Sequence, residues 1–111
     1  VAWCACFVSW CADQCGYIEA GTFTKFSYCD AGIAWFKSRG QWQTRGYCPS
    51  PGDIIFFDWN NNGVSDHVGI VESCDGYYVY TVEGNANNAV QQLRYSINYS
   101  GIEGYGTPNY G

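Results

Sequence analysis

Apolar and polar residues alternate with two different periods along the chain, and the first period is helical. An apolar face at i, i+4, i+7 and i+11 predicts a helix over residues 3–15, which Gly16 ends; it is formed by Cys4, Val8, Cys11 and Cys15. A second helix is predicted after the segment 27–30, which resembles a capping box with Asp30 in place of the usual glutamate. This helix carries apolar residues and ends near Gly40.

Beyond the turn at 49–52, in which proline fixes φ and glycine permits a positive φ, the pattern becomes that of strands. Apolar or alternating runs predict strands over residues 53–59, 67–73, 77–83 and 90–97, with a hairpin turn at Asp75-Gly76. We expect residues 41–47 to be irregular or a short edge segment. The end of the chain is predicted to be a glycine-rich tail with Gly101, Gly104, Gly106 and Gly111.

Helices that precede strands are typical of the α+β class. We therefore expect N-terminal helices packed on an antiparallel β-sheet, in one domain that spans residues 1–111. There is no internal repeat, linker or second domain in the pattern. Because the sequence contains no methionine, we expect a processed product, an excised domain or the ordered part of a longer protein.

The charge and the apolar runs argue against two classes of partner. The formal net charge is −5 with only five Lys and Arg residues, so there is no basic patch for nucleic acid. No apolar run approaches the roughly 20 residues that span a bilayer. We expect a monomer that binds neither nucleic acid nor membrane.

Cysteine is the residue type with the clearest chemical potential. The count of seven is odd, and in an oxidising compartment an odd cysteine is often a free, reactive thiol. Cys4 lies in the first turn of the predicted helix, where backbone N–H groups and the helix dipole favour the thiolate. Disulfides remain open among five of the others, and the alternative is that several are buried and reduced; these five are Cys11, Cys15, Cys29, Cys48 and Cys74. The zinc-ribbon pattern of paired CxxC motifs is absent, so we expect no structural metal.

His67 is the only histidine, so a cysteine hydrolase in this chain has only one candidate base. Pairing about the Asp75-Gly76 turn sets residue 67 near residue 84 of the next strand, so either Glu83 or Asn85 can lie beside the imidazole and orient it. Asp66 competes for this role, but as the neighbour of His67 in a strand it should point to the opposite face. A lone histidine is more often structural, yet this spacing allows a catalytic set of Cys4, His67 and Glu83.

Four blocks of sequence together resemble a known family, the CHAP domain (cysteine, histidine-dependent amidohydrolases/peptidases), which has a papain-like, NlpC/P60-related fold. The blocks are Trp3-Cys4-Ala5 with Phe7-Val8-Ser9-Trp10, then Pro51-Gly52-Asp53-Ile54-Ile55-Phe56-Phe57, then Asp66-His67-Val68-Gly69-Ile70-Val71, and Glu83-Gly84-Asn85. The resemblance implies that Cys4 is the nucleophile, His67 the base, Glu83 the acidic third member and Asn85 the polar residue that follows it. Cys6 falls on a variable position. Family members usually carry a helical segment before the nucleophile, and we expect the cleft wall that it forms to be missing, disordered or supplied elsewhere.

The resemblance further implies a secreted enzyme, an autolysin or a phage lysin, that acts at the bacterial cell wall. Its substrate would be peptidoglycan, cut at an amide bond either as an endopeptidase or as an N-acetylmuramoyl-L-alanine amidase. Two alternatives remain: a non-catalytic wall-binding module on the same scaffold, and an amidase that acts on a small peptide conjugate. A pure binder would have no use for Cys4, His67 and Glu83 together.

The segment from Asp58 to Gly63 copies the first half of an EF-hand calcium loop, with position nine at Asp66. Position twelve, which needs a bidentate glutamate, is Gly69, and two ligand positions are neutral asparagines. We therefore favour an Asx-stabilised turn over calcium ligation and expect no cofactor.

Overall fold

The computed structural model describes residues 29–61, 63, 65, 67–84 and 90–108. Within these residues the chain forms one helix and six strands: α2 (Cys29–Ser38), β1 (Trp42–Thr44), β2 (Ile54–Phe57), β3 (His67–Cys74), β4 (Tyr78–Gly84), β5 (Val90–Ser96) and β6 (Ile102–Gly106). The predicted helix over residues 3–15 lies outside the described residues. No helix of the described segments is both long and apolar enough to cross a membrane.

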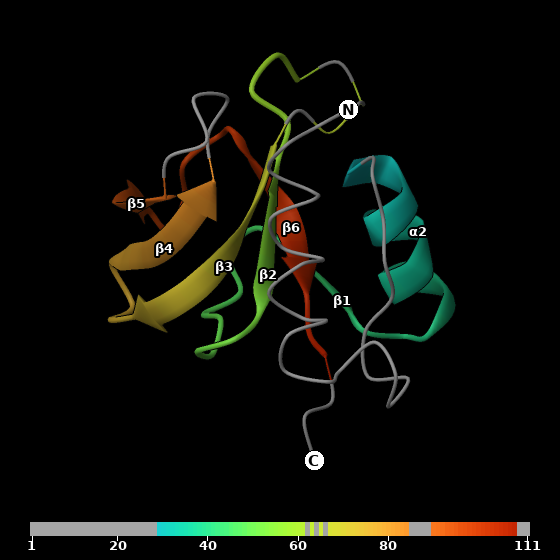
Figure 1. Ribbon diagram of the computed structural model, residues 1–111, viewed down its shortest axis with the longest axis horizontal. Helices are drawn as coiled ribbons and strands as arrows, with labels where there is room; N and C mark the ends of the chain where they lie inside the picture. Colours follow the sequence, from blue (N-terminus) through green and yellow to red (C-terminus); the bar gives the residue numbers. More distant parts are fainter. Residues whose placement is uncertain (1–28, 62, 64, 66, 85–89, 109–111) are drawn as a thin grey trace.

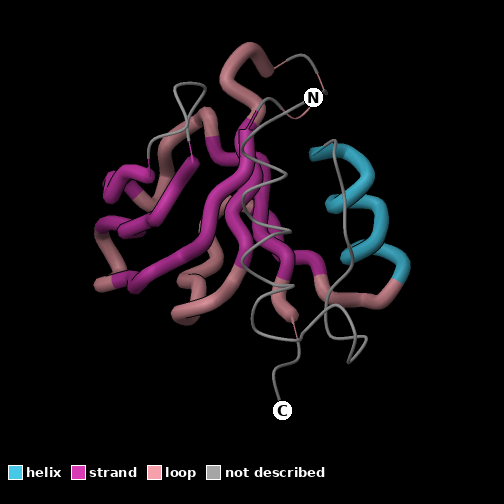
Figure 2. The backbone as a smooth tube through the Cα atoms, viewed as in Figure 1, coloured by secondary structure: helices cyan, strands magenta, loops and turns pink. Residues whose placement is uncertain are grey.

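The six strands form a single antiparallel sheet with the order β1-β6-β2-β3-β4-β5, and α2 lies beside the β1 and β6 end (Figure 1). Figure 2 shows how the strands follow one another across the sheet while the helix stands apart from the β5 end. The architecture is thus α+β, as predicted from the helical hydrophobic pattern that precedes the strand pattern in the sequence. Residues 41–47 were expected to be irregular or a short edge segment. They contain β1, which pairs only with β6 among the described strands.

Strand β2 is buried along its whole length because both faces of the sheet are covered at this point. On one face Phe56 contacts Phe36 of α2, with ring centroids 6.2 Å apart, and Trp42 of β1, at 5.6 Å. On the other face Ile55 and Phe57 belong to the main apolar cluster, whose other buried members are Val71, Val79, Ile102 and Tyr105. The alternation of side chains in a strand assigns neighbouring residues to these two cores.

The predicted glycine-rich tail is wrong for residues 102–106, which form the inner strand β6 between β1 and β2. The glycines fit there because large neighbours fill their space. A Cβ atom at Gly104 would lie 2.5 Å from the Trp42 ring, and one at Gly106 would collide with the Phe36 ring. Glycine in this strand therefore marks a close approach of α2 and β1 to the sheet.

Two predicted chain reversals are present with the expected chemistry. Helix α2 ends in a Schellman motif, in which Gly40 has φ 68° and the N–H groups of Gly40 and Gln41 donate to the carbonyls of Lys37 and Phe36. The turn before β2 has Gly52 at φ 91°, and the Asp53 N–H donates to the Ser50 carbonyl. These reversals set where β1 and β2 enter the sheet.

Candidate active site

His67 is the first residue of β3 and pairs with Phe57 of β2. Its ring lies 5.0 Å from the Trp59 ring at an interplanar angle of 22° and 5.7 Å from the Phe57 ring. The side chain is 12% exposed. The imidazole therefore belongs to a cluster of three rings at one end of the sheet, in which the Phe57 and Trp59 rings also contact each other at 5.6 Å.

Glu83 lies on β4 and reaches His67 across a glycine. The pairs Ile70–Val82 and Val71–Thr81 set a register that, continued by one step, places Gly69 opposite Glu83. A Cβ atom at residue 69 would lie 2.7 Å from Glu83 Cγ. Residues 67 and 69 share a face of β3. The absence of a side chain at Gly69 therefore leaves the space through which the Glu83 side chain reaches the imidazole.

This register differs from the predicted one, and the difference decides which face Glu83 occupies. The reversal is centred one residue later than predicted, on Gly76 and Tyr77, since the Asp75 N–H donates to the Tyr78 carbonyl and Cys74 pairs with Val79. A bulge at Glu72 then shifts the register between Val71 and Ser73. A turn centred on Asp75 and Gly76 without a bulge pairs residue 67 with residue 84 and places Glu83 opposite residue 68, on the wrong face.

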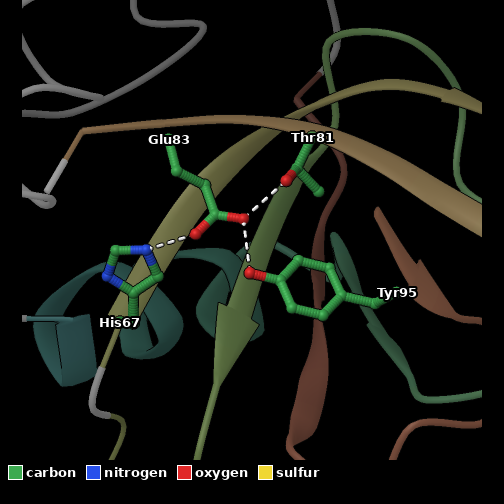
Figure 3. A network of polar contacts seen from close by, with 4 residues as sticks. All are labelled: His67, Thr81, Glu83 and Tyr95. Carbon is green, nitrogen blue, oxygen red and sulfur yellow. Dashed lines mark hydrogen bonds and ion pairs between the residues drawn. The ribbon is translucent and has the colours of Figure 1, made fainter. Parts of the chain in front are cut away.

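The Glu83 carboxylate is the centre of a small polar network (Figure 3). Its Oε1 lies 2.6 Å from His67 Nε2, and its Oε2 accepts hydrogen bonds from Thr81 Oγ1 at 2.5 Å and from Tyr95 Oη at 2.9 Å. Glu83 is only 2% exposed and Thr81 only 1%. Both carboxylate oxygens therefore have fixed partners, and one of them is aimed at the imidazole.

The network also sets the charge of its members. Burial by itself raises the pKa of Glu83, but hydrogen bonds from His67, Thr81 and Tyr95 outweigh burial and hold the pKa below its usual value. The pKa of Tyr95 is raised, first by burial and then by the negative charge of Glu83. Glu83 is thus an ionised acceptor at neutral pH, and Tyr95 is a neutral donor.

The ionised carboxylate selects one form of the neutral imidazole. An acceptor at Nε2 requires the proton on that nitrogen, which leaves the lone pair on Nδ1. Figure 3 shows the second ring nitrogen on the side turned away from Glu83. Such a ring can take a proton at Nδ1 while Glu83 stabilises the imidazolium that results.

The structure therefore brings together two of the predicted site residues, His67 and Glu83. The other two, Cys4 and Asn85, lie outside the described residues, as does the competing Asp66. Sequence reasoning missed Tyr95 and Trp59, since neither β5 pairing nor ring stacking has a local signal. It could have found Gly69, because a glycine inside an apolar strand indicates a close approach of another group.

In the loop after β2 the Asp58 side chain accepts a hydrogen bond from the backbone five residues on, which is longer than the two-residue span of an Asx turn. Asp58 Oδ2 accepts from the Gly63 N–H at 2.8 Å, and the Asp58 N–H donates to the Gly101 carbonyl. Asn61 has a positive φ of 52°. Among the residues that the structure describes, three or more His, Cys, Asp or Glu side chains nowhere gather closely enough to hold a metal. The preference for a turn over calcium ligation stays a prediction.

The CHAP domain family profile matches residues 1–85, which include all four blocks of the resemblance. This match covers more than half of the chain, so the protein belongs to the CHAP domain family. Members of this family are generally hydrolases of the amidase or peptidase type, with activity related to peptidoglycan.

A solved structure entitled "The crystal structure of Ly7917" is similar to this chain, with 23% identity and a TM-score of 0.47. The alignment covers 66% of this chain and 33% of that one, so the similarity spans about a third of the other protein. The comparison with curated proteins returned no match.

Proposed function

We propose that this chain is the catalytic domain of a peptidoglycan hydrolase that cuts amide bonds by a Cys-His-Glu mechanism on a papain-like scaffold. The observation that carries the proposal is the contact of 2.6 Å between His67 Nε2 and Glu83 Oε1, within a family match that also includes Cys4. An imidazole oriented by a buried carboxylate is the second half of a nucleophile–base–orienter set.

In the proposed reaction His67 takes the proton of the Cys4 thiol at Nδ1, and the Cys4 sulfur attacks the amide carbonyl carbon to form a tetrahedral intermediate. His67 donates a proton to the amine nitrogen, the C–N bond breaks, and an acyl-enzyme with a thioester remains. A water molecule then loses a proton to His67 and attacks the thioester, which releases the acid and restores the thiol. Glu83 keeps the imidazole in the required tautomer and stabilises its charged form. Asn85 is proposed as a further polar group of this catalytic set.

We place this reaction at the bacterial cell wall, in a secreted autolysin or a phage lysin. The negative net charge of −5 and the scarcity of Lys and Arg favour a wall polymer over nucleic acid as the partner. The bond is either the muramoyl–alanine amide or a peptide bond of the stem or cross-bridge.

Digestion of purified peptidoglycan tests the reaction type. Wild-type protein should release new free amino groups without new reducing sugars, because a glycosidase would need two carboxylates on either side of a sugar linkage. Cys4→Ala should abolish amine release and keep wall binding, while the matched control Cys6→Ala should keep activity. Reducing ends that persist in Cys4→Ala would overturn the amide-hydrolase proposal, and wall binding without any amine release by the wild type would favour the binding module.

The role of Glu83 is tested against that of its competitor. Glu83→Gln keeps the size of the side chain and removes the charge that orients His67, so kcat/KM should fall roughly 100-fold or more. Asp66→Asn should have a much smaller effect. Equal losses, or the reverse order, would remove Glu83 from the proposed set.

A further inference from the structure

We propose that Cys48 and Cys74 form an intramolecular disulfide bond that ties the segment before β2 to the end of β3. Their sulfur atoms lie 2.9 Å apart although the residues are 26 positions apart in sequence. A disulfide has an S–S distance of about 2.05 Å, so the two sulfurs need to approach by less than 1 Å. This inference does not depend on the proposed function.

Backbone hydrogen bonds keep the two cysteines together independently of their own contact. The Gly52 N–H donates to the Val71 carbonyl at 2.8 Å, and the Val71 N–H donates to the Asp53 carbonyl at 2.8 Å. These two bonds fasten the turn after Cys48 alongside β3, three residues before Cys74. The pair is therefore a consequence of strand pairing, and the unfolded chain has no such proximity.

Exposure of the two thiols indicates the order in which they react. Cys48 is exposed and Cys74 is half-buried. Burial, followed by the hydrogen bond with Cys48, raises the pKa of the Cys74 thiol. Cys48 is thus the cysteine that meets an oxidant first.

The oxidant is a small disulfide such as oxidised glutathione. The Cys48 sulfur attacks one glutathione sulfur, forms a mixed disulfide and displaces a glutathione thiol. The Cys74 sulfur then attacks the Cys48 sulfur and displaces the second glutathione. The two cysteine protons end on the two released glutathione thiols, so two protein thiols are oxidised and one small disulfide is reduced.

The cross-link lies at the opposite end of β3 from the candidate active site. His67 opens the strand and Cys74 closes it, and a strand of eight residues is about 23 Å long. Oxidation at this end therefore leaves the contact between His67 and Glu83 in place. It also removes two thiols that would otherwise compete with Cys4 for oxidants and alkylating reagents.

Peptide mapping tests the pairing directly. The full chain, as the Cys4→Ala variant to prevent exchange with the proposed nucleophile, is treated with oxidised glutathione, and its remaining thiols are alkylated after denaturation. Trypsin alone leaves both cysteines in one peptide, residues 46–94, so Asp-N is added to cut before Asp53, Asp66 and Asp75. We expect a linked pair, residues 46–52 with residues 66–74, that separates on reduction. Alkylated residues 46–52, or their linkage to any other cysteine, would overturn the inference.

Thermal unfolding gives a second readout. By the entropy of the closed loop, oxidised protein should have a Tm about 10 to 15 °C above that of the reduced protein. Cys48→Ser and Cys74→Ser should each lose this difference between oxidised and reduced samples, so every variant serves as its own control. A difference of the same size in both variants would assign the effect to other cysteines and contradict the proposal.

Discussion

Strands β2 and β5 belong to the same antiparallel sheet, yet they differ in burial and in the number of strands that pair with them. All four residues of β2 are buried, whereas every residue of β5 except Tyr95 is exposed. Strand β2 has paired neighbours on both sides, and β5 pairs with β4 at the edge. The half-buried residue of β5 is the one that reaches Glu83. The middle of the sheet thus carries the packing, while the edge strand supplies one polar contact to the site.

The largest expected loss of stability comes from truncating a buried side chain of β2. Phe57 is fully buried, and its ring lies 4.8 Å from the ring of Tyr95 and 5.7 Å from that of His67. Phe57→Ala should lower the free energy of unfolding by about 3 to 5 kcal/mol, because it removes a buried ring and leaves a cavity. Urea unfolding followed by tryptophan fluorescence measures the change. A loss below 1 kcal/mol would mean that β2 does not carry the core.

The sequence predicts the features of these strands that neighbouring residues determine, and it misses those that depend on residues distant in the chain. The apolar runs of β2 and β3 and the turns at Gly40 and Gly52 are local, and the structure confirms them. Strand β6 was missed because Gly104 and Gly106 weaken its apolar pattern, and only the facing rings explain them. The role of a glycine of this kind becomes visible only when its partner in space is known.

For the candidate site, the sequence predicts the partners better than the geometry that joins them. The expected contact of His67 with Glu83 is present. The register behind that expectation was wrong, since no local pattern announces the bulge at Glu72. Tyr95 could not be found because its contact with Glu83 depends on how β5 pairs with β4.

The next effect tests the contact that β5 does supply. Tyr95→Phe removes the hydroxyl that donates to Glu83 Oε2 but keeps the ring that packs on Phe57. The loss should be about 1 to 2 kcal/mol of unfolding free energy, because a buried carboxylate loses one of its donors. Tyr99→Phe is the matched control, since its ring stacks on Tyr95 at 5.6 Å and Glu83 accepts no hydrogen bond from it in the described network. Equal effects of the two variants would show that the hydroxyl of Tyr95 is not the important group.

The same network predicts a pH dependence of defined sign. Because the pKa of Glu83 is lower in the folded protein than in the unfolded chain, its contribution to stability is fully present above the unfolded value and is lost as pH falls through the folded one. Burial, only partly offset by the hydrogen bond from the Ser50 N–H, raises the pKa of Asp53, so that carboxyl acts in the opposite direction.

Unfolding free energies between pH 3 and pH 7 measure this effect. Compared with the wild type, Glu83→Gln should flatten the decline at acidic pH, and Asp53→Asn should steepen it. Unchanged slopes in both variants would contradict the assigned directions.

The smallest effect is expected at the exposed end of β5, where Val90 is 58% exposed. Val90→Thr keeps a β-branched side chain that suits a strand and removes little buried apolar surface, so the free energy of unfolding should change by less than about 0.5 kcal/mol. Urea unfolding measures the change in unfolding free energy for Val90→Thr and for Phe57→Ala under the same conditions. The ratio of the two changes compares the edge strand with the middle strand. If β5 serves the protein mainly through Tyr95, hydrolysis of peptidoglycan by Val90→Thr should equal that of the wild type. A loss above 1 kcal/mol would show instead that the end of β5 is packed in solution, and the contrast between the middle strand and the edge strand would then fail.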